Sequence, residues 1–594
     1  TNTTTNSSVT WSCDFGYTNH SDDVEDDYSD GGWGYRDLTF ESLLPTLSLS
    51  TNYLRLPAGP TNAVISTVFS PAALQPADPV SIWWTISPAH SNGLHIAGVT
   101  NYPYHGSNTL TLIAGDLGES YTITAHPYGL SSIAATATVD IIKVDLEELA
   151  FTNNHTVISD DSNTVYEAAH WQDPNRDGDP SDGRCYPLCF TRDTKMTVSG
   201  KWYLQSSAPG IALKIKGDGP GNLDFPATSA SISGNEVTIT NVECETAFAN
   251  EIDYMDPMTI EWKFSFDDGT TWCDAGTSTN QTYVTLGDPS TNVTLFHTVV
   301  HIGCKSGDGE SDTDDAVDAI WSDFTDCIVK RVDGETLYYY SNAVPTSCAT
   351  DLPGLLTTAD GQCQAWAYFF EATLLAQGID DAVVYVCSTD TVALWDSDDE
   401  DPPVTNKLFE LTSATTDGGF LVKHWSLLNP SWDNDANHNW INDDIESEFP
   451  DVIDNWESGE IGVVGEYEDF DMPYSDVLAS GSYEGTSDIT TTGTGLKGQG
   501  DIVPSVQMFP QHLFVVRGNP TMQPPEAYKL YDPSYGAKYE GADAVEQWVN
   551  SSLDGFYYLW GPPTNLQFYA GRIDTNCLIK VHMAPEDNLW GVEL

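Results

Sequence analysis

The stretch that decides the fold of the C-terminal half of this 594-residue chain runs from residue 361 to residue 370 and reads GQCQAWAYFF. Apolar residues continue beyond it, and Gly378 follows them. Glycine commonly ends a helix because it adopts the left-handed conformation without strain. The pattern therefore predicts a buried helix that begins near Cys363 and stops at Gly378.

Two more segments of this half indicate a mixed architecture. Residues 316–324 have the spacing of a helix, and residues 382–386 read AVVYV, a short apolar run typical of a buried strand. Helices and strands in this order predict an α+β domain over residues 295–594. Residues 388–504 are acidic and rich in loop-forming residues, and they are far longer than an ordinary connection. We therefore predict an inserted subdomain or a lid there.

A histidine and an aspartate lie on two further strand-like segments. Residues 512–516 read HLFVV, and residues 528–536 read YKLYDPSYG. If these segments form a hairpin with His512 directly opposite Asp532, both side chains lie on the same face of the sheet. This register predicts an imidazole beside a carboxylate.

A cysteine, a histidine and an aspartate in this arrangement suit thiol catalysis. A helix N-terminus and a neighbouring imidazolium both favour the thiolate form of a cysteine. We predict that Cys363 is the nucleophile, that His512 moves its proton and that Asp532 orients His512. The alternative is a buried structural cysteine, an unrelated strand histidine and a turn-forming Asp-Pro-Ser. His438 and His424 are weaker candidates for the base; no strand with Asp-Pro follows His438 at hairpin distance.

The motifs GQC at residues 361–363 and YDP at residues 531–533 resemble the transglutaminase-like branch of the papain-like cysteine enzymes. The resemblance covers roughly residues 300–390 and 505–540. It implies acyl transfer through a thioester on Cys363, with an amine or water as the acceptor. The chain departs from the family pattern in two ways: Gln364 stands where many transglutaminases have Trp, and the insertion is long.

The N-terminal half has a different pattern. Residues 1–43 form an acidic arm. Residues 44–146 contain short alternating segments separated by Gly, Pro and Asn, which predict a β-sandwich similar to the immunoglobulin-like domains of bacterial and archaeal surface proteins. Residues 147–294 predict a second β-sandwich in the same way.

One loop of the second sandwich has the spacing of a calcium site. Residues 173–183 read DPNRDGDPSDG, with oxygen-bearing side chains at alternate positions and glycine at the sixth. This is the beginning of an EF-hand-type loop, although Arg184 occupies the twelfth position, where that loop has Glu. The predicted calcium ligands are Asp173, Asn175, Asp177, Asp179 and Asp182. The alternative is a solvated acidic turn.

The charge of the chain limits its partners. A formal net charge of −66 repels the phosphates of nucleic acids and anionic membranes, so neither is an expected partner. No run is long and apolar enough to span a bilayer. The chain starts at Thr1 without a signal sequence, so we expect a secreted or cell-surface protein whose signal peptide has been removed.

Cysteine and asparagine patterns point to the same compartment. The eleven cysteines contain no CxxC pair, which argues against a zinc ribbon. Many scattered cysteines in a β-rich, acidic chain favour an oxidising environment, with five disulfides and one free thiol at Cys363. The alternative is several unpaired thiols in the core. Glycosylation sequons that predict a glycoprotein occur at Asn2, Asn6, Asn19, Asn154, Asn280, Asn292 and Asn550.

These observations support two functions. The first is an extracellular protein that transfers acyl groups, or hydrolyses amides, on a protein substrate. The second is a structural surface-layer, adhesin or filament subunit that assembles with copies of itself and has a catalytically silent transglutaminase-like domain.

Overall fold

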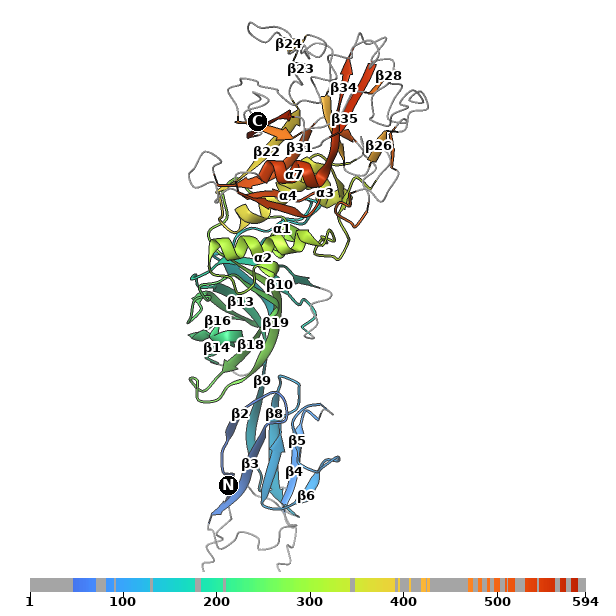
Figure 1. Ribbon diagram of the computed structural model, residues 1–594. Coiled ribbons are helices and arrows are strands. Elements are labelled where there is room, and N and C mark those ends of the chain that lie inside the picture. The colour runs from blue at the N-terminus through green and yellow to red at the C-terminus, as the bar shows by residue number, and fades with distance from the viewer. Residues whose placement is uncertain are drawn as a thin grey trace, which may run out of the picture.

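The computed structural model is an elongated molecule in which three parts follow one another from the N-terminus to the C-terminus (Figure 1). Two β-sandwiches come first, and an α+β part follows. The structure describes residues 46–70, 82–89, 92–128, 132–176, 183–206, 210–341, 348–389, 394–395, 405–406, 418–422, 425–427, 468–473, 479–482, 489–491, 496–502, 508–509, 511–518, 529–541, 544–560, 567–572 and 578–585. The predicted acidic arm, residues 1–43, lies outside them.

The first sandwich consists of two sheets that pack face to face. Its strands are β1 (Thr46–Leu49), β2 (Tyr53–Pro57), β3 (Asn62–Ser70), β4 (Ile82–Ser87), β5 (His95–Ile96), β6 (Tyr104–Gly106), β7 (Thr109–Ile113), β8 (Ser120–Pro127) and β9 (Ala135–Thr152). One sheet has the order β1-β3-β7-β5; β6, β4, β8, β9 and β2 form the other. Ile65 and Leu112 from the first sheet pack against Trp84, Ile123 and Val139 from the second. This alternation of buried and outward residues is what the sequence predicts.

Strand β9 belongs to both sandwiches. Its first residues pair with β8, for example Ala135 with Ala125. Its later residues pair with β13 of the second sandwich, for example Leu149 with Gly200. The boundary expected between residues 146 and 147 therefore falls inside a continuous strand.

The second sandwich is again made of two facing layers. Its strands are β10 (Trp171–Gln172), β11 (Arg184–Cys185), β12 (Leu188–Thr191), β13 (Thr197–Gln205), β14 (Lys214–Asp218), β15 (Phe225–Ser229), β16 (Ser231–Ser233), β17 (Glu236–Glu243), β18 (Asp253–Ser265) and β19 (Cys273–Thr285). One layer has the order β16-β17-β13-β9, and the other has the order β12-β19-β18-β14-β15. Trp202 and Trp262 from the two layers meet edge to face, with ring centroids 5.4 Å apart.

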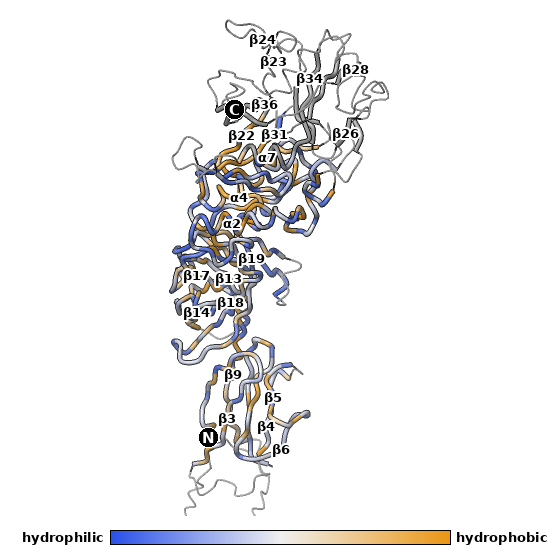
Figure 2. The backbone as a smooth tube through the Cα atoms, viewed as in Figure 1, coloured by the Kyte–Doolittle hydropathy of each residue, from blue (hydrophilic) through white to orange (hydrophobic). Residues whose placement is uncertain are grey.

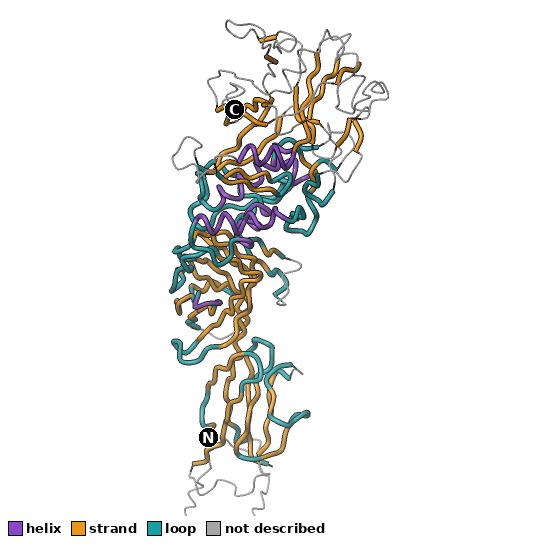
Figure 3. Tube along the Cα trace, in the orientation of Figure 1, coloured by secondary structure: helices purple, strands orange, loops and turns teal. Residues whose placement is uncertain are grey.

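The α+β part places helices between the second sandwich and its own sheets (Figure 3). The helices are α1 (His297–Ser306), α2 (Thr313–Thr325), α3 (Leu352–Thr358), α4 (Cys363–Ala376) and α7 (Ala544–Ser552). Helix α4 begins at Cys363, and Gly378 follows it with a φ of 72°, so the predicted helix is confirmed.

The main sheet of this part has the order β27-β36-β22-β31-β32-β33, and a second sheet has the order β28-β35-β34-β25-β30. The strands of the α+β part are β20 (Tyr338–Tyr339), β21 (Asp360–Gly361), β22 (Ala382–Thr389), β23 (Leu394–Trp395), β24 (Thr405–Asn406), β25 (Gly418–Val422), β26 (Trp425–Leu427), β27 (Glu468–Pro473), β28 (Ala479–Ser482), β29 (Ile489–Thr491), β30 (Met508–Phe509), β31 (Gln511–Arg517), β32 (Lys529–Asp532), β33 (Ala537–Glu540), β34 (Leu553–Trp560), β35 (Gln567–Arg572) and β36 (Leu578–Pro585). The predicted insertion, residues 388–504, thus contributes strands to both sheets.

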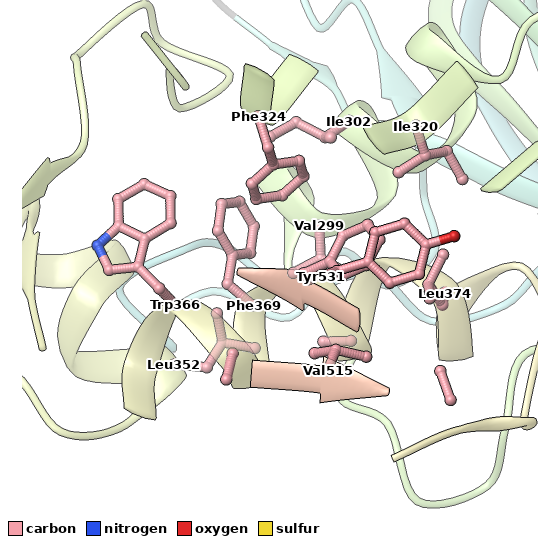
Figure 4. Packing of buried hydrophobic residues seen from close by; sticks show 14 of the residues in the cluster. Val299, Ile302, Ile320, Phe324, Leu352, Trp366, Phe369, Leu374, Val515 and Tyr531 are labelled. Carbon is pink, nitrogen blue, oxygen red and sulfur yellow. The ribbon is translucent and has the colours of Figure 1, made fainter. Parts of the chain in front are cut away.

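A large apolar core holds α4 against the main sheet. Figure 4 shows Phe324 and Phe369 close to Tyr531, with Trp366 on the other side of Phe369. The hydropathy view shows apolar segments continuing from the second sandwich into the α+β part (Figure 2). The same core includes Val157, Tyr283 and Leu286 of the second sandwich. The two parts, which the sequence divides at residues 294 and 295, therefore share one core.

Candidate active site

Cys363 is the first residue of α4, and a tight loop holds it there. The backbone N–H of Gln362 donates to the carbonyl of Ala349 at 2.8 Å, and the N–H of Tyr340 donates to the carbonyl of Gly361 at 3.3 Å. A Cβ on Gly361 would lie 3.0 Å from Leu355 and 3.1 Å from Ala365, so glycine allows the loop to pack closely beside the helix. The side chain of Cys363 thus lies at the helix end where backbone N–H groups are unpaired.

His512 on β31 and Asp532 on β32 form a buried pair. His512 Nε2 lies 2.9 Å from Asp532 Oδ2, and neither side chain is exposed. The register differs from the predicted one, because Val515 pairs with Tyr531 and Val516 with Leu530. Continued along the strands, this register places Asp532 opposite residue 514, so the prediction was wrong by two positions. A shift of two keeps both side chains on one face, and diagonal neighbours remain within reach.

The carboxylate of Asp532 is held by two further donors. The indole N–H of Trp548 on α7 donates to Oδ2 at 2.9 Å, and the backbone N–H of Ser534 donates to Oδ1 at 3.2 Å. Charge-assisted hydrogen bonds of this kind stabilise an ionised carboxylate in a buried setting. The pair is therefore fixed from outside the hairpin as well as within it.

Aromatic rings hold the imidazole of His512 from both sides. Its centroid is 5.5 Å from Tyr535, with planes 18° apart, and 5.5 Å from Trp548, with planes 16° apart. Phe514 meets the ring edge-on at 5.6 Å. Packing of this kind allows the imidazole one orientation, as a site that moves a proton between fixed atoms requires.

The electrostatic setting favours a charged imidazole. Burial by itself lowers the pKa of His512, but the carboxylate of Asp532 and the sulfur of Cys363 raise the pKa to about 10. The structure thus brings the three predicted residues together, with the thiol and the carboxylate both interacting with His512. An imidazolium beside a thiol favours the thiolate.

Tyrosines complete the surroundings of Cys363. The charge of Cys363 acts on the phenols of Tyr339, Tyr340 and Tyr535. Burial raises the pKa of Tyr339 and Tyr535 well above the ordinary value, so both keep their protons. The two phenols interact with each other, and neither oxygen has a hydrogen bond of full geometry to another described group. They are buried donors close to the sulfur.

The sequence does not identify a side-chain donor near the thiol: it offers Trp321 and Tyr338 to Tyr340 without a ranking. The structure places Tyr339 and Tyr340 there. Tyr535 and Trp548 were missed. Tyr535 follows Asp532 within one turn and could have been found by its closeness; Trp548 lies on a separate helix, and nothing in its local sequence indicates its role. His424 and His438 lie outside the described residues.

The predicted disulfides are wrong for the cysteines that the structure describes. All nine of them are free thiols: Cys185, Cys189, Cys244, Cys273, Cys304, Cys327, Cys348, Cys363 and Cys387. Several have partners of another kind. Cys304, for example, donates to the carbonyl of Val284 and accepts from Gln377 at 3.3 Å. An odd cysteine count therefore does not single out Cys363; its position does.

The calcium loop is described only at its start. Asp173 is buried, and its Oδ1 accepts the backbone N–H of Arg176 at 2.7 Å; Asn175 is exposed. Asp177, Asp179 and Asp182 lie outside the described residues. Among the side chains that can be placed, no three of His, Cys, Asp or Glu converge on one metal position. Calcium binding stays a prediction.

The glycosylation sequon at Asn280 is buried in the folded chain. The side chain of Asn280 is buried and donates to the carbonyls of His170 and Tyr186 at 3.2 and 2.9 Å. Asn292, in contrast, is exposed. Sugar attachment at Asn280 would break both hydrogen bonds.

Comparisons with known proteins leave the site unassigned. No protein-family model and no curated protein matches this chain. Among solved structures, the Escherichia coli adhesin FdeC is 12% identical over 40% of this chain and 63% of its own, with a TM-score of 0.21. The Yersinia pseudotuberculosis adhesin InvE is 12% identical over 41% and 58%, with a TM-score of 0.14. Domains 4–9 of the surface layer protein SbsC are 11% identical over 41% and 32%, with a TM-score of 0.12.

This chain therefore spans less than two thirds of each of those three chains. Structural similarity with TM-scores this low gives no basis for inferring function. What the chain does has to be argued from its own residues.

Proposed function

We propose that the α+β part is a thiol-dependent acyl-transfer enzyme of the transglutaminase-like type. The observation that supports it is the buried pair of His512 and Asp532, 2.9 Å apart, beside a cysteine at the start of a helix. A structural role does not require these three side chains to meet. Acyl transfer through a thiol uses these three groups: a nucleophile, a base that moves its proton, and a carboxylate that orients the base.

The proposed reaction has two steps. The thiolate of Cys363 attacks the carbonyl carbon of an amide, the C–N bond breaks, and the departing amine takes the proton that His512 holds. A thioester on Cys363 results. A second amine, or water, then attacks the thioester and gives its proton to His512 as the C–S bond breaks and the thiolate is restored.

Charge that develops on the substrate oxygen has donors nearby. The backbone N–H of Cys363 lies in the first turn of α4, and the buried phenols of Tyr339 and Tyr535 interact with each other and with the charge of Cys363. Donors fixed in a dry site stabilise an oxyanion more than donors in water do. We assign this role to the two phenols.

The first test is thiol reactivity. Limiting iodoacetamide at pH 7, followed by peptide mapping, should label Cys363 at least about tenfold faster than the exposed Cys185 if a thiolate is present. His512→Ala should remove this preference, and Cys363→Ala should leave only background labelling. Equal labelling of Cys363 and Cys185 in the wild-type chain would argue against an activated thiol.

The second test is turnover. The wild-type chain should incorporate a fluorescent primary amine into a glutamine-containing protein, or hydrolyse a p-nitrophenyl ester, and Cys363→Ala should do neither. Tyr339→Phe and Tyr535→Phe should lower the rate but preserve iodoacetamide labelling. This difference would separate a donor to the substrate from a group that activates the thiol.

A second candidate function is a silent scaffold in a structural surface protein. One observation favours it: Cys363 is only 5% exposed, and His512 and Asp532 are fully buried. On this reading the elongated chain assembles with neighbouring copies of itself. Absence of selective labelling and of turnover, together with ordered arrays of the purified chain by electron microscopy, would favour the scaffold.

We also propose an extracellular, cell-surface location. The support comes from the net charge of −66 and from the two sandwiches in tandem. No helix in the described residues is long and apolar enough to cross a membrane. Protease treatment of intact source cells should degrade the chain if it is displayed outside, whereas protection would contradict this location.

A further inference from the structure

The outer face of one sheet in the first sandwich carries almost no charge, in a chain with 88 acidic residues. Side chains alternate along each strand, so the residues opposite the buried ones point outward. On β6, β4, β8 and the first part of β9 the outward residues are Trp83, Thr85, Ser87, His105, Ser120, Thr122, Thr124, His126, Thr136 and Thr138. All are hydroxyl-bearing, aromatic or imidazole side chains.

Among the described residues, the charged side chains on this face are Asp140 of β9 and Arg55 of β2, which lie opposite each other toward the second sandwich. Asp140 pairs with Ser120 across the sheet and is buried. Its carboxylate accepts hydrogen bonds from the hydroxyls of Tyr53 and Ser120, each at 2.5 Å. The rest of the outward set is neutral when its histidines are neutral.

The strand register arranges these side chains in rows. Thr85 lies opposite Thr124, and Thr124 lies opposite Thr136. Ser87, Thr122 and Thr138 form the next row in the same way. Neighbours within a row are about 4.8 Å apart, and the rows are about 6.7 Å apart. The face is therefore a regular array of hydroxyl groups.

Four rings lie together at one end of this array, and we call them the aromatic platform: Trp83, His105, His126 and Tyr128. Trp83 pairs across the sheet with both His105 and His126. The ring centroid of Trp83 is 5.4 Å from His105, 6.2 Å from His126 and 6.0 Å from Tyr128. The planes of Trp83 and Tyr128 differ by 22°, and Tyr128 is 66% exposed. His105 and Tyr128 are exposed to solvent, and Trp83 and His126 are half-buried beside them.

The platform lies at the outer end of the molecule. The last residues of β8 pair with the first residues of β9, whereas the later residues of β9 enter the second sandwich. His126 and Tyr128 are therefore at the end of the first sandwich that is farthest from the α+β part (Figure 1). A ligand bound there would lie far from the described residues of the α+β part.

We propose that the aromatic platform and the adjoining hydroxyl rows bind a neutral carbohydrate chain. Aromatic rings exposed on a surface stack on flat apolar faces, and a sugar ring presents such a face through its C–H groups. Threonine hydroxyls and imidazoles exchange hydrogen bonds with sugar hydroxyls in either direction. Stacking groups combined with a few polar groups are typical of ligand sites.

The lack of charge selects this ligand over others. An anionic ligand needs Lys or Arg, and Arg55, the described residue of that kind on this face, lies opposite Asp140 and donates to Tyr53, away from the aromatic platform. A cationic ligand would be bound through the carboxylates that are abundant elsewhere on this chain. The core of a protein–protein interface is enriched in Met, Phe and Arg as well as in Tyr and Trp. Here rows of hydroxyls surround one Trp and one Tyr, which suits a polyhydroxylated partner.

The test uses the full chain and immobilised neutral polysaccharides: cellulose, chitin, mannan and β-glucan. At least one should retain the wild-type chain, and a soluble oligosaccharide of the same sugar should release it. Trp83→Ala and Tyr128→Ala should each weaken retention at least tenfold. Val64→Ala is the matched control, because Val64 is 61% exposed on the other sheet of the same sandwich.

Two further measurements keep the test decisive. Retention should be nearly unchanged between about 0.1 and 1 M NaCl, because screening affects charged contacts and not stacking. Cys363→Ala should bind as the wild type does, so that loss of the proposed acyl transfer and loss of sugar binding are distinguishable. Failure of all four polysaccharides to retain the chain, equal retention of the Trp83 and Tyr128 variants, or release by salt would each overturn the proposal.

Discussion

At the scale of single residues, the carboxylate of Asp532 is held by several groups at once. It accepts hydrogen bonds from His512, Trp548 and the backbone of Ser534, and it is fully buried. A buried carboxylate without such partners would be protonated or would destabilise the fold. Its partners come from three different parts of the chain, so the pair depends on the assembled domain.

Asp532→Asn should change the pH dependence of stability. The pKa of His512 is raised to about 10 from an ordinary 6.5, so its contribution is complete below 6.5 and is lost as the pH rises through 10. Urea unfolding of the wild type should therefore show falling stability between pH 7 and 10. The variant, which leaves His512 without its charge partner, should be less stable at pH 7 by about 3 kcal/mol and should lose little more at high pH.

Asp333→Asn is the control for that measurement. Asp333 pairs with Arg331 but is 54% exposed, so its loss should cost less than about 1 kcal/mol at every pH. If Asp532→Asn and the wild type had parallel pH profiles, the coupling between His512 and Asp532 would be refuted.

Trp548→Phe separates hydrogen bonding from stacking. The substitution removes the indole N–H that donates to Asp532 but keeps an aromatic ring near His512. We expect amine incorporation to fall about tenfold, as loss of a supporting hydrogen bond commonly produces. Circular dichroism should be unchanged. Trp272→Phe, far from the site, should retain full activity; a Trp548→Phe enzyme with wild-type rates would exclude a positioning role.

At the scale of elements, the sequence predicted the features that depend on residues close together in the chain. Helix α4 was predictable because its apolar run and Gly378 are contiguous in sequence. The face shared by His512 and Asp532 was predictable because strand alternation has a period of two. The register was not, because it is set by how β31 and β32 pack between β22 and β33. The support from α7 was not predictable because it depends on tertiary packing.

The loop of residues 173–183 carries the calcium prediction. If it binds calcium in the folded state only, saturating calcium should raise Tm by several degrees relative to EGTA, with magnesium much less effective. Asp179→Asn should remove the shift without lowering Tm in EGTA. An unchanged Tm on adding calcium to the chelated wild type would show that the loop is a solvated acidic turn.

At the scale of the whole molecule, neighbouring parts share structure instead of meeting at linkers. Strand β9 serves two sandwiches, and one core joins the second sandwich to the helices. Sequence composition distinguishes the two sandwiches and the α+β part, but it does not show that they share a strand and a core. A strand that belongs to two sandwiches has the same residue pattern as any other strand. The charge of −66 is likewise a property of the whole chain, and the neutral face of the first sandwich stands out only against it.

Truncation tests whether the second sandwich depends on the first part of β9. A fragment that starts at residue 147 loses the part of β9 in which Leu146 pairs with Trp202 and Val144 with Leu204. A fragment that starts at residue 135 keeps those pairs. We expect the second sandwich to resist trypsin in the longer fragment and to be degraded much faster in the shorter one. Equal resistance would show that the second sandwich does not need this part of β9.

Strand β9 also decides how the molecule responds to tension. The strand runs along the long axis and is hydrogen-bonded sideways to β8 and β13 (Figure 1). A pull between the outer tip and the helices would load these hydrogen bonds in shear, so that many must break together, whereas a flexible linker would simply extend. A tip held by a sugar polymer would therefore transmit force to the α+β part without a slack joint between the sandwiches.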